Sequence, residues 1–417
     1  MRKITKETVW SDPSETPRRT GGEDERDERM KTLETPIASA TFRLNWRWVT
    51  PAAIGTMCGV LALTVPSVRQ LFAAEGLRWL YIVLFAFLGT GALTPIMVHL
   101  GHQWNLVDHP CDRKIHTQPT PLLGGIAIYC GFVGSVLLNS ILPEGMVGIL
   151  VAGSLLLVVG VLDDVWNLPA SMKLGAQLFA ASIVIMTGKV LTLFPAGPIG
   201  EAANIVLTVL WIVGITNAFN FFDGMDGLAT GLAVLMAGFM GMVAFETNQP
   251  GLGWLAVAII GSGLGFLPYN FRWNKPAVIF LGDGGSTFLG FTLACLAVKG
   301  NWADHNPIVS FSNPLLIFGL LIYDMIHITV ERVLTGKVRS VKEWLEYVGK
   351  DHLHHRLERT LRNRTASVLM VFTLTTCLGL AALALRRAGT MEAILLLTQA
   401  CLIVIMVTIL ELSARRR

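Results

Sequence analysis

Hydrophobic residues occur along this chain in long, almost uninterrupted runs, and polar residues gather between the runs. Most runs approach the roughly 20 residues that an α-helix needs to cross a bilayer. Twelve of them predict transmembrane helices, near residues 48–68, 79–101, 122–139, 146–162, 173–188, 202–217, 227–245, 252–269, 284–299, 311–331, 365–385 and 391–412. The predicted fold class is therefore all-α, a polytopic membrane helix bundle.

Composition agrees with a membrane location. Of the 417 residues, 53% are hydrophobic and only 15% are charged, whereas soluble domains carry about 25% charged residues. The net charge of +4 is modest and gives no reason to expect a nucleic-acid partner. The six cysteines form no Cys-x-x-Cys pair, which favours small buried side chains over disulfides or zinc ligands.

The N-terminal part differs in kind from the rest. Residues 1–47 are polar, lack apolar periodicity and contain the charge cluster GGEDERDERMK, which predicts a disordered cytoplasmic tail. Residues 48–78 are expected to form an extra transmembrane segment and a short external loop. Residues 79–417 then form one membrane domain with eleven helices.

The polar loops of this domain alternate in character. Those after its first, third, fifth, seventh and ninth helices hold most of the Lys and Arg residues, including eight between Lys337 and Arg364. Alternation places these five loops on one side of the membrane, and their positive charge predicts that this side is cytoplasmic. The sequence therefore predicts a single composite site at the cytoplasmic face.

Carboxylates at the predicted helix ends are the first candidate chemistry. They are Asp163, Asp164, Asp223, Asp226 and Asp283. Helix capping explains one aspartate in a loop, but it does not explain two adjacent ones or a pair three residues apart. Ionisable groups near the bilayer are costly and usually functional. Convergent Asp and Asn oxygens suit Mg²⁺, which keeps waters and binds substrate phosphates.

Basic residues occur in the same loops, at Lys114, Lys173, Arg272 and Lys275. A metal held by carboxylates beside such cations is typical of phosphoryl transfer. The segment KDHLHHRLER adds His352, His354, His355 and Arg356. A zinc site is one interpretation, but the i, i+4 spacing of common zinc pairs is missing. A segment that binds a diphosphate anion fits better.

Three further ionisable residues, Asp324, His327 and Glu331, fall on one face of the helix predicted at 311–331. A structural ion pair with Arg332 and a role in lining the site are both open.

Five motifs in order resemble the polyprenyl-phosphate N-acetylhexosamine-1-phosphate transferases, glycosyltransferase family 4. They are DHPCDRKIHTQPTPLLGGIAIY, DDVWNLPASMKLGAQ, NAFNFFDGMDGLATG, LGDGGSTFLG and HLHHRL, and they span about residues 105–357. The resemblance implies eleven family helices, to which this chain adds one N-terminal helix.

The resemblance also implies an activity. Such enzymes transfer a sugar 1-phosphate from a UDP-N-acetylhexosamine to a membrane polyprenyl phosphate, release UMP and need Mg²⁺ or Mn²⁺. The sequence His-Leu-His-His-Arg-Leu resembles the branch that makes undecaprenyl-diphospho-GlcNAc from UDP-GlcNAc and undecaprenyl phosphate. That branch initiates cell-surface polysaccharides such as lipopolysaccharide O-antigen, at the cytoplasmic face of the inner membrane.

Residue roles follow from the same resemblance. Asp283 matches the metal ligand and Asn220 assists it. Asp163 and Asp164 match the paired catalytic aspartates, which act on the lipid phosphate or, in an older view, form a covalent intermediate. Substrate-binding residues are expected at Lys114, Lys173, Asn217, Asp223, Asp226, His352, His354, His355 and Arg356.

Other interpretations remain. The same reaction could use another UDP-N-acetylhexosamine, and a homodimer is open. A secondary transporter also places charges in a membrane, but its site tends to lie near the midplane within broken helices. A polyprenyl diphosphate phosphatase would use similar acids and bases without needing a nucleotide.

Overall fold

The computed structural model describes residues 51–110, 118–273, 275–303, 307–340, 343–344, 347, 349, 351–386 and 388–415. The predicted tail at 1–47 and Lys114 lie outside these residues. The elements are α2 (Pro51–Thr64), α3 (Pro66–Ala74), α4 (Arg78–Gln103), β1 (Val107–Asp108), β2 (Thr120–Pro121), α5 (Gly124–Leu138), α6 (Met146–Trp166), α7 (Ala170–Met186), α8 (Pro198–Phe221), α9 (Leu228–Glu246), α10 (Pro250–Asn270), α11 (Gly282–Lys299), α12 (Pro307–Ile317), α13 (Gly319–Leu334), α15 (Leu353–Leu361), α16 (Arg364–Leu385) and α17 (Thr390–Arg415).

The predicted polytopic helical fold is confirmed. Every predicted run contains a helix, and seven helices in the described part of the chain are long and apolar enough to cross a membrane. The number is up to nine if each of two bent pairs counts as one span. Two strands of two residues each, β1 and β2, form a small antiparallel sheet.

Two predicted helices are broken where a single span was expected. The helices α2 and α3 meet at 75°, and α12 and α13 meet at 77°. The first break follows from Pro66 at the start of α3, because proline disfavours a helical conformation of the preceding residue, and Val65 is extended. The second break lies between α12, which contains Pro314, and Gly319 at the start of α13.

Helix α11 lies at the centre of the bundle. All its residues from Gly284 to Val298 are buried, and it packs against α5, α6, α8 and α9. Its backbone meets that of α6 at Gly160. A Cβ on Gly160 would lie 2.5 Å from the Gly284 nitrogen and 2.7 Å from the carbonyl carbon of Asp283. This close crossing brings the end of α6 next to the start of α11.

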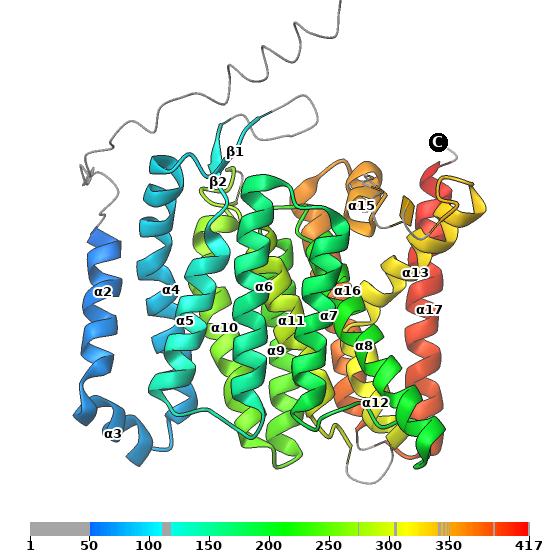
Figure 1. The fold of residues 1–417 in the computed structure, drawn as a ribbon, viewed down its shortest axis with the longest axis horizontal. Coiled ribbons are helices and arrows are strands. Elements are labelled where there is room, and N and C mark those ends of the chain that lie inside the picture. The colour runs from blue at the N-terminus through cyan, green and yellow to red at the C-terminus, as the bar shows by residue number, and fades with distance from the viewer. Residues whose placement is uncertain are drawn as a thin grey trace, which may run out of the picture. The chain divides into compact units, whose positions relative to one another are not determined.

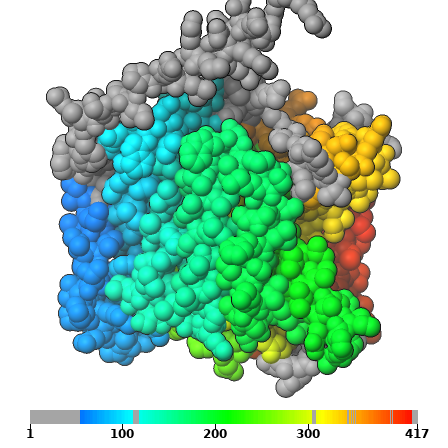
Figure 2. Space-filling model, in the orientation of Figure 1, coloured from blue at the N-terminus to red at the C-terminus, as the bar shows by residue number. Residues whose placement is uncertain are grey.

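One end of the bundle carries the irregular elements. The strands β1 and β2 and helix α15 lie at this end, and α3 lies at the opposite end (Figure 1). The sheet is hydrogen-bonded to the segment that leads into α11, because the Phe280 N–H donates to the Pro121 carbonyl at 2.8 Å. In the same orientation, side chains of α5, α6 and α7 cover much of the face turned to the viewer (Figure 2). The end with β1, β2 and α15 holds the site.

Candidate active site

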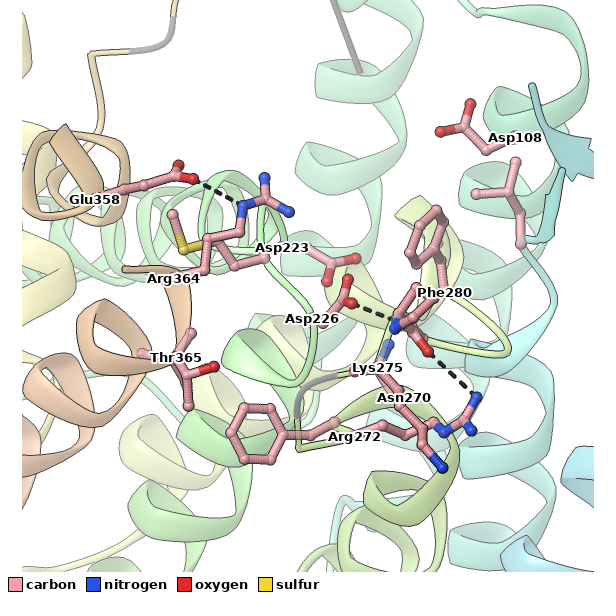
Figure 3. Close-up of a pocket in the computed structure, with 18 of the residues that line it drawn as sticks. Asp108, Asp223, Asp226, Asn270, Arg272, Lys275, Phe280, Glu358, Arg364 and Thr365 are labelled. Atoms are coloured by element: carbon pink, nitrogen blue, oxygen red, sulfur yellow. Dashed lines mark hydrogen bonds and ion pairs between the residues drawn. The ribbon is translucent and has the colours of Figure 1, made fainter. Parts of the chain in front are cut away.

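A cavity of about 590 Å³ opens at this end of the bundle (Figure 3). Each of the five loops that the sequence placed on one side contributes a residue to its lining. These residues are Asp108, Asp164, Asp223, Arg272 and His355. The structure therefore brings together loops that lie up to about 250 positions apart in the sequence.

A groove of about 580 Å³ adjoins the cavity. Its walls come from the apolar middles of α6, α7 and α8, and Leu178 and Leu210 on them are 44% and 65% exposed. Its polar residues come from the ends of the same helices, at Asp163, Lys173, Asn217 and Asn220. Among the described residues, Asp283 alone borders both the groove and the cavity.

The adjacent aspartates at the end of α6 face different spaces. Asp163 borders the groove, where its carboxylate accepts hydrogen bonds from Lys173 Nζ and the Leu168 N–H, both at 2.7 Å. Asp164 borders the cavity and accepts a hydrogen bond from the Asp283 N–H at 3.1 Å. Successive helical residues point about 100° apart, so a pair of neighbours reaches both spaces.

Asp283 is held from several helices at once. Asn220 of α8 donates to Asp283 Oδ1 at 3.1 Å and to Ser286 Oγ at 2.9 Å. Lys173 of α7 lies 3.8 Å from Asp283 Oδ2. One turn before Asn220, Asn217 exchanges hydrogen bonds with Gln177 at 2.6 and 3.2 Å in the groove. The carboxylate at the junction is thus fixed by α7, α8 and the crossing with α6.

The turn between α8 and α9 supplies the second acidic pair. Asp226 accepts a hydrogen bond from the Ala277 N–H at 3.0 Å, and Asn270 accepts one from Gly227 at 2.9 Å. Burial, together with the charges of Asp283, Asp164 and Asp226, raises the pKa of Asp223 well above its usual range. A cation or a donor-rich ligand in the cavity would lower that electrostatic cost.

The histidine segment is placed mainly behind the cavity. His355 lines the cavity, whereas His352, His354 and Arg356 are buried. Burial, with the positive charges of neighbouring residues, lowers the pKa of His354 well below its usual range. Both ring nitrogens of His354 lack a hydrogen-bond partner among the described residues. The predicted substrate contacts of His352, His354 and Arg356 stay predictions.

The sequence left some cavity residues unnoticed. Arg364 donates to Glu358 at 2.8 Å, and both line the cavity from α15 and α16. Phe280 contributes an aromatic ring to a lining that also includes Lys275 and Arg272 (Figure 3). Arg364 and Glu358 lie in the basic loop after the ninth domain helix. The predicted position of this loop on the same side as the site was the sequence signal that could have identified them.

Within the described residues, no three His, Cys, Asp or Glu side chains converge closely enough to hold a metal ion by themselves. Carboxylate oxygens that could bind a metal ion are nevertheless present. Asp164 Oδ2 is buried without a hydrogen-bond partner in that part of the chain, and Asp283 stands next to it. Two carboxylates of this kind match the sparse protein coordination that Mg²⁺ accepts when waters and phosphates complete its shell.

The fold and the site define a multi-pass helical membrane protein with a carboxylate-rich centre between a polar cavity and an apolar groove. The sequence model of glycosyl transferase family 4 matches residues 146–301. A Bacillus subtilis protein named probable undecaprenyl-phosphate N-acetylglucosaminyl 1-phosphate transferase is 35% identical over 302 residues, 71% of this chain and 82% of that protein.

Two further relatives are similar. Decaprenyl-phosphate N-acetylglucosaminephosphotransferase of Mycobacterium tuberculosis is 30% identical over 76% of this chain and 84% of its own. Undecaprenyl-phosphate alpha-N-acetylglucosaminyl 1-phosphate transferase of Escherichia coli is 29% identical over 64% of this chain and 72% of its own. The chain belongs to glycosyl transferase family 4, among the polyprenyl-phosphate N-acetylhexosamine-1-phosphate transferases.

Proposed function

We propose that this protein transfers N-acetylglucosamine 1-phosphate from UDP-GlcNAc to undecaprenyl phosphate, which gives undecaprenyl-diphospho-GlcNAc and UMP. The product would be the first lipid-linked intermediate of a cell-surface polysaccharide. The named relatives act on a polyprenyl phosphate and an N-acetylglucosaminyl 1-phosphate group, which supports this choice of acceptor and sugar.

The observation that carries the proposal is the shared border at Asp283. A reaction between a membrane lipid and a water-soluble nucleotide sugar needs two approaches that meet at the reacting atoms. The groove offers exposed apolar walls and a polar end with Lys173, which suits a polyprenyl tail and its phosphate. The cavity offers Arg272, Lys275, Arg364 and the Phe280 ring, which suit a diphosphate and a base that stacks.

The chemical step is a displacement at the β-phosphorus of the donor. An oxygen of the lipid phosphate forms a bond to that phosphorus, while the bond to the bridging oxygen breaks and UMP leaves with it. Lys173 neutralises charge on the lipid phosphate, and Asp163 orients the phosphate or accepts its proton. Because phosphoryl transfer needs little covalent help, placing the two phosphates accounts for most of the rate.

We also propose Mg²⁺, or Mn²⁺, as the cofactor, held by Asp283 and Asp164 near Asp223. When bound, the ion neutralises charge that develops on the departing UMP. The buried, unpartnered oxygen of Asp164 and the raised pKa of Asp223 support this assignment. Asn220 contributes by holding Asp283, to which it donates its amide N–H.

The positive charge of the loops at this end supports a cytoplasmic orientation of the site in the inner membrane. UDP-sugars would then reach the cavity directly, and the lipid would enter the groove sideways.

The test is a transfer assay with purified protein, undecaprenyl phosphate and a panel of UDP-sugars. The expected result is UMP release that requires UDP-GlcNAc, the lipid phosphate and Mg²⁺ together. Release of inorganic phosphate from a polyprenyl diphosphate without any nucleotide would instead indicate a phosphatase. If a different UDP-N-acetylhexosamine reacts and UDP-GlcNAc does not, only the choice of sugar is wrong.

A further inference from the structure

Helix α13 holds the histidine segment in place by a buried carboxylate. Asp324 is fully buried and accepts three hydrogen bonds from this segment. The donors are His352 Nδ1 at 2.8 Å, the Leu353 N–H at 2.8 Å and the Arg356 guanidinium at 3.1 Å. Asp324 therefore pairs with the histidine segment and not with Arg332, which was the ion pair that the sequence left open. These hydrogen bonds set the orientation of the segment.

Arg332 makes a second link between the same two elements. Its guanidinium donates two hydrogen bonds to the Asp351 carboxylate, at 2.7 and 2.8 Å. Asp351 directly precedes His352, and Arg332 lies about two turns from Asp324 along α13. Bidentate pairs of this kind fix geometry as well as contributing energy. The segment is therefore clamped to α13 at two points.

The same helix also contributes a side chain to the lining of the groove. Met325, the neighbour of Asp324, lines the groove together with Trp344 and Tyr347. The Trp344 indole N–H donates to Thr329 of α13 at 3.1 Å, and the Arg332 guanidinium lies 4.4 Å from the centre of the Tyr347 ring. The residues that clamp the histidine segment thus also support the groove wall.

A series of ring contacts also connects the two spaces. The His352 ring lies 4.9 Å from that of Phe221, which lines the groove. The His352 ring also stacks on that of His354, with 6.1 Å between the ring centres, and the His354 ring lies 4.2 Å from that of His355, which lines the cavity. Asp324 holds the first ring of this series by its Nδ1 atom.

We propose that Asp324 and Arg332 are positioning residues that join the acceptor groove to the donor cavity, so that a lipid phosphate in the groove strengthens nucleotide binding in the cavity. The proposal rests on the function proposed above. A lipid that presses on Met325, Tyr347 or Phe221 shifts or fixes α13 and His352, and His355 follows. By thermodynamic linkage, the nucleotide strengthens binding of the lipid by the same factor.

The experiment measures UDP binding to the protein in nanodiscs, with and without undecaprenyl phosphate, and initial rates over a matrix of both substrates. In the wild type, the lipid should tighten UDP binding on the order of fivefold or more. The variant Asp324→Asn replaces one acceptor oxygen by a donor group, so it should reduce this factor below about twofold. It should also raise the KM for UDP-GlcNAc more than it lowers kcat.

The variant Tyr323→Phe is a matched control. It also removes one hydrogen bond from α13, but that bond runs to Thr408 of α17 at 2.8 Å, away from the histidine segment. It should keep the wild-type coupling and KM values. Should Asp324→Asn fail to fold, Asp351→Asn makes the same test, because Asp351 is partly exposed and acts through Arg332.

The inference is overturned if the wild-type lipid and nucleotide bind independently, or if Asp324→Asn, or Asp351→Asn where Asp324→Asn does not fold, keeps the wild-type coupling. A fall in kcat alone, with both KM values unchanged, also contradicts it. These outcomes are distinct from a failure of the proposed function, in which the wild type itself transfers no sugar phosphate.

Discussion

The crossing of α6 and α11 at Gly160 gives the sharpest prediction about how the site is built. An alanine Cβ at Gly160 would lie 2.5 Å from the Gly284 nitrogen, about 0.9 Å short of ordinary contact at 3.4 Å. Both neighbours are backbone atoms of a buried helix, so no side chain can rotate away. The two helices must therefore move apart by roughly 1 Å, and Asp163 and Asp164 move away from Asp283.

The expected cost can be divided between folding and catalysis. Overpacking of a well-packed core lowers the free energy of unfolding by about 1–3 kcal/mol. A misplacement of about 1 Å at a reacting centre costs on the order of 100-fold in rate, or about 2.7 kcal/mol of transition-state stabilisation. Gly160→Ala should thus fold with a lower Tm and show kcat reduced roughly 100-fold.

The measurement is UMP release at saturating substrates, together with thermal unfolding in the same nanodiscs. Gly175→Ala on α7 is the matched control, since a Cβ at that position meets nothing within 4 Å. It should leave kcat unchanged and stabilise the helix by about 0.5–1 kcal/mol. A Gly160→Ala protein with a rate within threefold of wild type would refute the view that this crossing sets the distance between the carboxylates.

Three further predictions concern the ionisable residues. Asp283→Asn should lower kcat at least about 1,000-fold with the fold retained, and excess Mg²⁺ should not restore it; near-normal transfer would remove Asp283 from the site. Lys173→Met should raise the KM for the lipid phosphate about tenfold or more and affect UDP binding little, as titration with each ligand would show. Burial acts to raise the pKa of Asp351, but the hydrogen bonds and charge of Arg332 outweigh it and hold the pKa below its usual range. Since a depressed carboxyl pKa stabilises the fold above the unfolded value, the Tm gap between wild type and Asp351→Asn should stay constant from pH 8 to 5 and shrink below about pH 4; a gap that widens in acid would contradict the assignment.

The feature of the site that the sequence predicted best was that its residues share one end of the helix bundle. Alternation of helices needs only a count of apolar runs, and this count placed Asp164, Asp223 and His355 on one face before any contact was known. The structure brings those three to one cavity. The helices themselves could be predicted equally well, because an apolar run in a bilayer has few alternatives to the α-helix.

The breaks in two helices and the directions of individual side chains were harder to predict from the sequence. Pro66 signals a break only weakly, because membrane helices tolerate proline, as α4 does at Pro95. The placement of His352 and Arg356 behind the cavity depends on Asp324, a residue of another helix. A motif read along one segment does not contain that long-range contact, so its residues all look equally exposed to substrate.

Under the proposed function, the doubled aspartate at the end of α6 serves two substrates of opposite polarity. A polyprenyl phosphate and a nucleotide sugar would approach from different sides, and of the two neighbouring carboxylates Asp163 lines the groove and Asp164 lines the cavity. Neighbouring positions on a helix diverge by about 100°, so Asp163 and Asp164 are the shortest arrangement that puts one carboxylate in the groove and one in the cavity. A spacing of three or four residues would place both on the same face. The pair therefore belongs at a helix end that separates the two spaces, with Asp283 between them.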